Sequence, residues 1–315
     1  MLIAMAPTSV VVAALLVAVA GPPSSPEYFP LRIAVAGSPD VGGQPVELRT
    51  FRSEVLAATA LADGKVALAA TSLDAALRIG HARGKPPRLV AALTSAPAVA
   101  LMVSSAETRV DELSDLRGRR IGTTGPGTPG AHALETLLAR RELTLSHVTT
   151  VSLDEPALVA ALARGQLAAA MLSDPWVTRL VQEGHARPLI DLRRRADQTR
   201  WLGAETIHAG LFARADTKLG AAELDAVRRA LDQATARARA AAPEALLTGL
   251  PASVRGLPAD WTLRVEGARE TYRSGPVTTE LLDASIDLVK LRAPLPSVVQ
   301  VPRDLSQLLA PTAPR

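Results

Sequence analysis

Short apolar segments that alternate with helical segments place the strongest constraint on how this chain folds. Between Leu31 and Arg214 most of the apolar stretches are separated by segments with helical spacing of apolar residues. This alternation is typical of an open α/β sheet. The expected strands are 31–36, 45–51, 65–71, 88–95, 98–104, 119–124, 148–153, 167–172, 186–192 and 206–214. The expected helices are 55–61, 72–83, 130–141, 155–164 and 175–183, and only helices follow Asp216.

The N-terminal segment has the composition of an export signal. Residues 1–26 carry no charge, and Val10–Ala20 is an apolar run of 11 residues that ends in Ala-Val-Ala. A signal-peptide core has this length and this kind of cleavage site, whereas a membrane-spanning helix needs about 20 apolar residues. No Lys or Arg precedes the run, so a retained membrane tether is the alternative. We expect residues 1–26 to form a signal peptide and a disordered linker, which implies a periplasmic protein.

Composition excludes several classes of function. The chain has no cysteine, which rules out disulfides, thiolate catalysis and cysteine-ligated metal clusters. Its 35 basic and 31 acidic residues leave a charge of +4, and the longest basic run is only Arg193–Arg195, so no nucleic-acid partner is expected. The sequence contains no Gly-x-Ser-x-Gly motif, and His81, His147 and His185 lack metal-ligand spacing. We therefore expect no enzyme activity, catalytic residue, metal or cofactor.

A glycine-rich turn at Gly125-x-Gly127-x-x-Gly130 leaves two interpretations open. It follows a strand and begins a helix, as in a dinucleotide-binding fingerprint, and Asp154 lies 24 residues further on, where a ribose-binding acid belongs. An NAD(P)-binding oxidoreductase is therefore one alternative. Against it, Pro126 and Pro129 remove two backbone N–H donors from the turn. The turn also suits an oxyanion, because free N–H groups and a partial positive charge lie at a helix N-terminus.

The order of segments resembles a family of transport proteins. Four features between Leu113 and Arg193 carry the resemblance: DLRGRRIG, the glycine turn followed by His132, ALARGQLAAAMLSDP and LIDLR. Together they resemble the second lobe of the substrate-binding proteins of ABC importers, in the branch that binds nitrate, taurine, alkanesulfonates and thiamine-pyrimidine precursors. VALAATSLDAALRIGHARG and RLVAALTSAPAVALMV resemble parts of the first lobe. The resemblance covers roughly residues 31–290.

This resemblance implies a two-lobed α/β fold of the periplasmic-binding-protein type II, or Venus-flytrap, class. Each lobe would be an open α/β sheet, and two crossover strands would join them. Lobe one would comprise 31–104 and 210–305, lobe two would comprise 105–209, and 306–315 would be a loose tail. The crossovers would lie near 104–109 and 206–210.

The resemblance also implies a function and a set of site residues. The protein would be a monomer that captures a small anionic or polar solute, such as a sulfonate, nitrate, a carboxylate or a pyrimidine. It would deliver the solute to the membrane permease and ATPase of an ABC importer. No lysine or arginine falls in the expected pocket loops, so neutral donors would hold an anion. The candidate ligand-binding residues are Ser38, Thr71, Ser72, Thr94, Ser95, Thr128, Gly130, His132, Asp174, Trp176 and His208.

One departure from the family pattern keeps a third function open. In the family a helix follows the first strand, but here GSPDVGGQ replaces it and is too short for a helix. Either the pocket is more open or Ser38 and Asp40 serve from a short loop. A sensor or scaffold that kept the fold without a transport pocket would also fit this departure.

Overall fold

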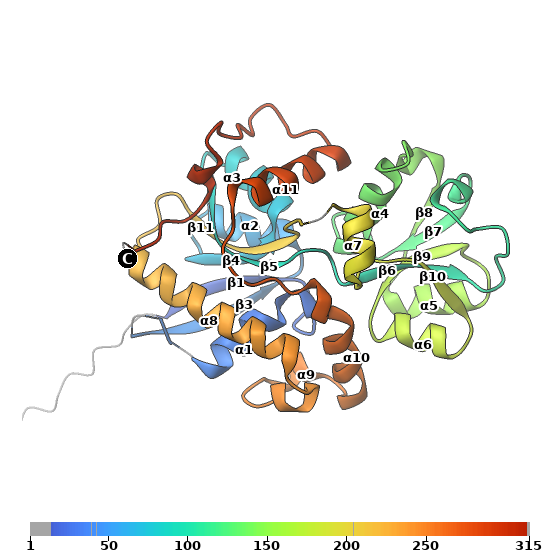
Figure 1. The fold of residues 1–315 in the computed structure, drawn as a ribbon, viewed down its shortest axis with the longest axis horizontal. Helices are drawn as coiled ribbons and strands as arrows, with labels where there is room; N and C mark the ends of the chain where they lie inside the picture. The colour runs from blue at the N-terminus through green and yellow to red at the C-terminus, as the bar shows by residue number, and fades with distance from the viewer. Residues whose placement is uncertain (1–13, 39, 42, 204, 314–315) are drawn as a thin grey trace, which may run out of the picture.

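Two β-sheets divide the chain into two lobes (Figure 1). The computed structural model describes residues 14–38, 40–41, 43–203 and 205–313. Sheet one, in lobe one, has the order β2 (Asp40–Val41), β3 (Gln44–Phe51), β1 (Leu15–Ala20), β4 (Leu68–Ser72), β11 (Ala209–Arg214), β5 (Pro87–Thr94). Sheet two, in lobe two, has the order β10 (Ala186–Asp191), β6 (Val99–Ser104), β9 (Ala169–Ser173), β7 (Arg120–Thr123), β8 (Thr149–Ser152).

Helices cover both sheets, as the alternating sequence pattern predicts. The helices of lobe one are α1 (Phe29–Gly37), α2 (Glu54–Ala62), α3 (Leu73–Ala82), α8 (Ala221–Ala240), α9 (Ala252–Arg255), α10 (Pro258–Ala268) and α11 (Thr279–Arg292). Those of lobe two are α4 (Pro129–Ala139), α5 (Glu155–Ala163), α6 (Trp176–Gln182) and α7 (Arg195–Trp201). Short 3₁₀ helices complete the chain: η1 (Pro26–Tyr28), η2 (Leu113–Leu116), η3 (Leu145–His147), η4 (Pro243–Leu246), η5 (Arg269–Thr271) and η6 (Leu305–Leu308). No helix of the described ranges is long and apolar enough to cross a membrane.

Strand β1 corrects the interpretation of the N-terminal segment. The apolar run expected to be a signal-peptide core contributes Leu15–Ala20, which pairs in parallel with β3 on one side and β4 on the other. Ala18, Val19 and Ala20 are completely buried. A strand buried on both faces needs an uninterrupted apolar sequence, and a signal-peptide core has the same composition. The prediction that 1–26 is a leader and disordered linker is therefore wrong for 14–26, while residues 1–13 lie outside the described ranges.

The segment Leu31–Ala36 is helical, although a strand was expected. It lies within α1, which packs on α8. Pro30 lies in the first turn of this helix, where proline is favourable. A short continuous apolar run does not distinguish a buried strand from a buried helix by its periodicity. Since β1 is the first strand, α1 is the helix that the family pattern requires after it. The helix was missing from the sequence-based prediction only because 31–36 was taken as the first strand.

The boundaries between the lobes also differ from the predicted ones. Strand β6 belongs to sheet two, so the first crossover lies between Thr94 and Val99 rather than at 104–109. The second crossover lies between α7 and β11, close to the predicted 206–210. The described part of the predicted loose tail, 306–313, packs on lobe one. Ala310 is buried, its N–H donates to the Leu89 carbonyl at 2.9 Å, and its carbonyl accepts from Arg228.

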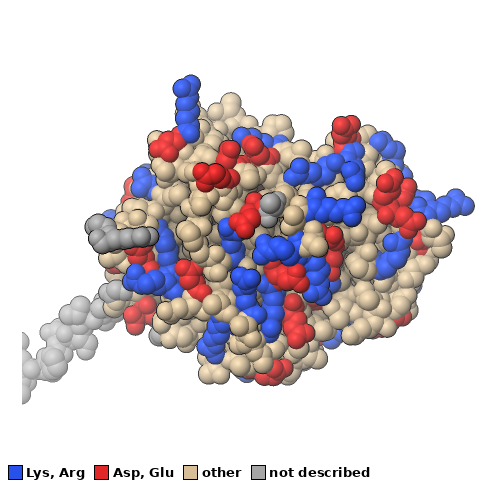
Figure 2. Space-filling view, in the orientation of Figure 1, with Lys and Arg blue, Asp and Glu red and all other residues tan. Residues whose placement is uncertain are grey.

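Ion pairs hold the two lobes against each other. Acidic and basic side chains are intermixed on the face seen in Figure 2, including the region where the lobes meet. Arg292 of α11 contacts Glu135 of α4 at 2.8 Å, and Arg194 contacts Glu270 at 3.1 Å. Arg179 of α6 pairs with Asp260 of α10. The described conformation is thus one in which the lobes touch across the crossovers.

Removal of β1 should abolish folding of lobe one. A chain that begins at Gly21 lacks the strand that joins β3 to β4 and should show no cooperative thermal unfolding of this lobe by circular dichroism. A chain that begins at Ala14 keeps every described strand and serves as the matched control. Equal cooperativity and melting temperature in the two chains would contradict the placement of β1.

Substitution of Gly267 should disturb closure of the lobes. A Cβ atom on this α10 residue would lie 1.9 Å from Asp174 Oδ2 in lobe two. Gly267→Ala should therefore destabilise the closed arrangement by roughly 1–3 kcal/mol, the usual cost of overpacking, and small-angle scattering should report a larger radius of gyration. Gly37→Ala, where a Cβ meets no atom within 4 Å, is the control. An unchanged radius for Gly267→Ala would refute the contact.

Candidate functional site

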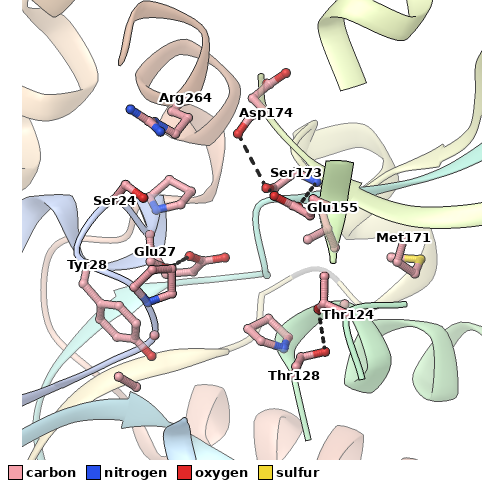
Figure 3. Close-up of a pocket in the computed structure, with 18 of the residues that line it drawn as sticks. Ser24, Glu27, Tyr28, Thr124, Thr128, Glu155, Met171, Ser173, Asp174 and Arg264 are labelled. Carbon is pink, nitrogen blue, oxygen red and sulfur yellow. Dashed lines mark hydrogen bonds between the residues drawn. The ribbon is translucent and has the colours of Figure 1, made fainter. Parts of the chain in front are cut away.

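A cavity of about 430 Å³ lies between the two lobes. It is at the carboxyl ends of parallel strands from both sheets, which is where open α/β sheets bind ligands. Lobe one contributes the loop after β1, the start of α2 and one face of α10, and lobe two contributes the loops after β7 and β9 and the start of α5 (Figure 3). The polar and charged lining residues include Ser24, Ser25, Glu27, Tyr28, Arg52, Ser53, Glu54, Thr124, Thr128, Glu155, Ser173, Asp174, Asp260 and Arg264.

The loop after β1 forms the wall on the side of lobe one. Gly21 has a φ of 74°, a left-handed conformation that favours glycine, and it turns the chain immediately after the strand. The Glu27 carboxylate accepts a hydrogen bond from the Ser25 hydroxyl. Tyr28 is 3% exposed, and its hydroxyl has no hydrogen-bond partner among the described residues. Glu27 and Tyr28 therefore present a carboxylate and a free phenol on the same wall (Figure 3).

The glycine-rich turn forms part of the wall on the side of lobe two. Gly125 and Gly127 have φ values of 121° and 74°, so both positions favour glycine. Thr128 is the N-cap of α4: its hydroxyl accepts from the Ala131 N–H at 3.4 Å and donates to the Gly125 carbonyl at 2.8 Å. Hydrogen bonds of the Thr128 side chain thus stabilise the turn. Gly127, Thr128 and Gly130 border the cavity.

Two carboxylates of lobe two border the cavity in different states. Glu155 accepts from the backbone N–H and the hydroxyl of Ser173, at 3.1 and 2.7 Å, while burial raises its pKa. Asp174 forms an ion pair with Arg193 and accepts from the hydroxyl of Thr178 at 2.8 Å. Asp174 is therefore neutralised within the protein, whereas Glu155 has no Lys or Arg within salt-bridge distance among the described residues.

Glu54 forms a buried cluster with two histidines. Its carboxylate oxygens lie 3.7 Å from His132 Nδ1 of lobe two and 3.8 Å from His208 Nε2 at the second crossover. Burial raises the pKa of Glu54 to about 8 and lowers the pKa of His208 to about 3. Burial also lowers the pKa of His132. The three groups are therefore neutral near pH 7, because the low-polarity surroundings disfavour each charged form.

The structure places the predicted site residues in four groups. Thr128, Gly130, Asp174 and Trp176 line the main cavity. Ser72, Ser95, His132 and His208 line a second cavity of about 60 Å³. The two histidines are those that contact Glu54. Thr71 and Thr94 border neither cavity: they are fully buried and hydrogen-bonded to the Glu54 carbonyl and the Ala209 N–H. Ser38 lines a separate space between α1 and α8.

Two details of the predicted site are corrected. Ser38 follows the C-terminus of α1, the end of the helix that points away from the main cavity, because this segment is not a strand end. The helix expected at 175–183 begins at Trp176 with Pro175 as its N-cap residue, and Asp174 Oδ1 accepts from the Thr178 N–H at 3.1 Å. Trp176 borders the cavity with the Arg179 guanidinium 5.5 Å from its ring centroid.

Sequence analysis missed the charged residues of the cavity. Glu27 and Tyr28 were hidden because the segment before them was assigned to a leader, and Arg264 lies on a C-terminal helix with no motif. Arg52 and Arg264 line the cavity, although no lysine or arginine falls in the expected pocket loops. Which groups hold an anion stays a prediction. The available signal was the order apolar run, turn, helix at 15–37, which matches the family pattern once the run is taken as a strand.

The rival nucleotide site lacks its ribose-binding acid. Asp154 caps α5, with Oδ1 accepting from the Ala157 N–H at 2.9 Å. This bond explains the residue without a ribose.

Comparison with known proteins agrees with this geometry. Residues 45–245, more than half of the chain, match the family described as NMT1/THI5 like. The chain belongs to this family. The match, together with the two-lobed fold, confirms the resemblance found in the sequence. No curated protein matches the chain in sequence.

Solved structures share the fold at low sequence identity. The periplasmic aliphatic sulphonate binding protein SsuA from Escherichia coli has a TM-score of 0.72 at 18% identity, over 95% of this chain and 92% of that one. The alkanesulfonate-binding protein SsuA from Xanthomonas axonopodis pv. citri, bound to MOPS, has a TM-score of 0.66 at 20% identity, over 91% and 96%. The periplasmic nitrate-binding protein NrtA from Synechocystis PCC 6803 has a TM-score of 0.54 at 13% identity, over 82% and 69%.

The buried Glu54 should make stability fall as pH rises. Its folded pKa of about 8 exceeds the ordinary value of about 4.3, so the folded state holds the proton more tightly, and stability is lost as the pH rises through about 8. His208 and His132, whose folded pKa values are lowered, act in the opposite direction below about pH 6.5. Between pH 6.5 and 8 the effect of Glu54 dominates, with a limiting slope of about 1.4 kcal/mol per pH unit.

Urea unfolding at several pH values checks this. Glu54→Gln should gain stability relative to the parent chain from pH 6.5 to 8, and Glu47→Gln, at an exposed position on β3, should follow the parent. A constant difference between Glu54→Gln and the parent would show that Glu54 does not titrate in this range.

Proposed function

We propose that this chain is the solute-binding component of an ABC importer. It captures a small polar organic solute in the cavity between the lobes and presents it to a membrane permease that works with an ATPase. The observation that carries the proposal is the cavity itself, into which strand ends and helix starts from both lobes converge. Such a site uses binding and lobe closure rather than chemistry.

The family and the structural relatives support the proposal. Sulfonate-binding and nitrate-binding proteins share the two-lobed fold, and periplasmic proteins are among them. We place this chain in the periplasm as a monomer. Its export cannot depend on removal of 15–20, because these residues form the central strand of lobe one. Any export signal must therefore end before Leu15.

The two rival functions lose their main arguments. The sensor or scaffold hypothesis depended on a missing helix, but α1 follows β1. The oxidoreductase hypothesis depended on the glycine turn together with Asp154, which caps α5. Neither rival has an observation that favours it over solute binding.

Thermal unfolding with a panel of solutes tests the proposal. Sulfonates, nitrate, carboxylates, amines and pyrimidines at about 100 times the dissociation constant should stabilise the protein by about 2.7 kcal/mol if bound, which raises the melting temperature by several degrees. Trp176→Ala should reduce the shift, because its ring borders the cavity. Val181→Ala on the same helix, outside the cavity and exposed, is the control. A panel without any stabilising solute would refute transport.

A further inference from the structure

The charged groups of the main cavity are mostly acidic. Five carboxyl groups line it, on Glu27, Glu54, Glu155, Asp174 and Asp260, against the two guanidinium groups of Arg52 and Arg264. Asp174 and Asp260 have their own partners, Arg193 and Arg179, outside the lining. Glu54 is neutral near pH 7 because burial raises its pKa to about 8. Glu27 and Glu155 remain, and no Lys or Arg of the described residues lies within salt-bridge distance of either. The cavity therefore has two carboxyl groups without a salt-bridge partner, one from each lobe.

The two arginines compensate these carboxyl groups only in part. Burial lowers the pKa of Arg264, whereas the charges of Asp260 and Glu155 raise it, and Arg264 forms no salt bridge with Glu155. Arg264 donates from Nη2 to the Arg255 carbonyl at 2.8 Å, and Figure 3 shows its side chain directed away from the Glu155 side of the cavity. Arg52 is exposed at the rim. Solvent screens its charge more strongly than that of a buried group.

One buried group on the same cavity lacks a partner. The Tyr28 hydroxyl has no hydrogen bond among the described residues, although Tyr28 is only 3% exposed. Unsatisfied buried polar groups are rare in native proteins and call for a specific explanation. The phenol oxygen of Tyr28 can accept a hydrogen bond from a donor such as an ammonium group. This observation is independent of the carboxyl groups and is compatible with the same kind of ligand.

We propose that the solute carries a protonated amine or amidine, which Glu27 and Glu155 bind from opposite lobes. The inference rests on the proposed function and specifies its substrate class. Glu27 belongs to lobe one and Glu155 to lobe two, and both border the cavity (Figure 3). A cation between them attracts both carboxylates, whereas a lone anion is repelled by both.

The same arrangement couples binding to closure. Burial raises the pKa of Glu155, and the charge of Glu27 on the other lobe raises it further. When the site is empty, their repulsion opposes approach of the lobes. A bound ammonium or amidinium group removes this repulsion and is held only when both lobes are in contact with it. The ligand therefore favours the closed state by its differential affinity.

Two series of matched compounds test the substrate class by isothermal titration calorimetry on the full-length protein. The first series is 1,4-diaminobutane, 1,4-butanediol and butane-1-sulfonate, and the second is benzamidine, benzamide and benzenesulfonate. In at least one series the cationic member should bind about tenfold or more tightly than its neutral and anionic counterparts, which corresponds to one charge-assisted hydrogen bond.

Variants then test the two carboxylates. Glu27→Gln and Glu155→Gln should each weaken the cationic compound about tenfold and leave the neutral compound unchanged, which separates a charge effect from a folding defect. Glu183→Gln, an exposed residue at the end of α6, should change neither affinity.

The outcomes distinguish the inference from the proposed function. Tighter binding of a sulfonate than of its cationic counterpart would overturn the inference and leave solute binding intact. Equal weakening of cationic and neutral compounds by both Gln variants would also overturn it. If no compound of either series and none of the solute panel binds, both proposals fail.

Discussion

Burial of β1 between two parallel strands is the contact on which lobe one and the cleft depend. The strand supplies the hydrogen bonds that connect β3 to β4, and its apolar side chains lie in the centre of the first core. The segment with Glu27 and Tyr28 follows the carboxyl end of this strand. The position of one strand thus determines both the stability of the lobe and the composition of one wall of the site.

Much of the fold could be predicted from the sequence, because strand and helix periodicities are local properties. Segments such as 167–172 and 155–164 lie close to their observed strand and helix, and the order of segments indicated the family. The first 37 residues could not be assigned in this way. An uncharged apolar run satisfies the requirements of a signal peptide and of a doubly buried strand equally well, and only the tertiary pairing distinguishes them.

The candidate site was predictable to a smaller extent for a related reason. Thr128 and Trp176 lie where a helix begins after a strand, so their position at the sheet edge could be inferred from the chain order. Glu54 and Glu155 also begin helices after strands, but acidic residues in a first helical turn are common for electrostatic reasons alone. Arg264 lies on α10, about 90 residues away from the motifs of lobe two, and only tertiary packing brings it to the cavity.

The strand order of sheet one has a consequence for synthesis of the protein. Strand β11 lies between β4 and β5, although about 120 residues separate it from β5 in the chain. Lobe two, from β6 to α7, is continuous and can acquire its core while it emerges from the ribosome. The sheet of lobe one lacks β11, and therefore the link between β4 and β5, until residue 214 has been translated. Its unpaired strand edges are then the part of the nascent chain most in need of a chaperone.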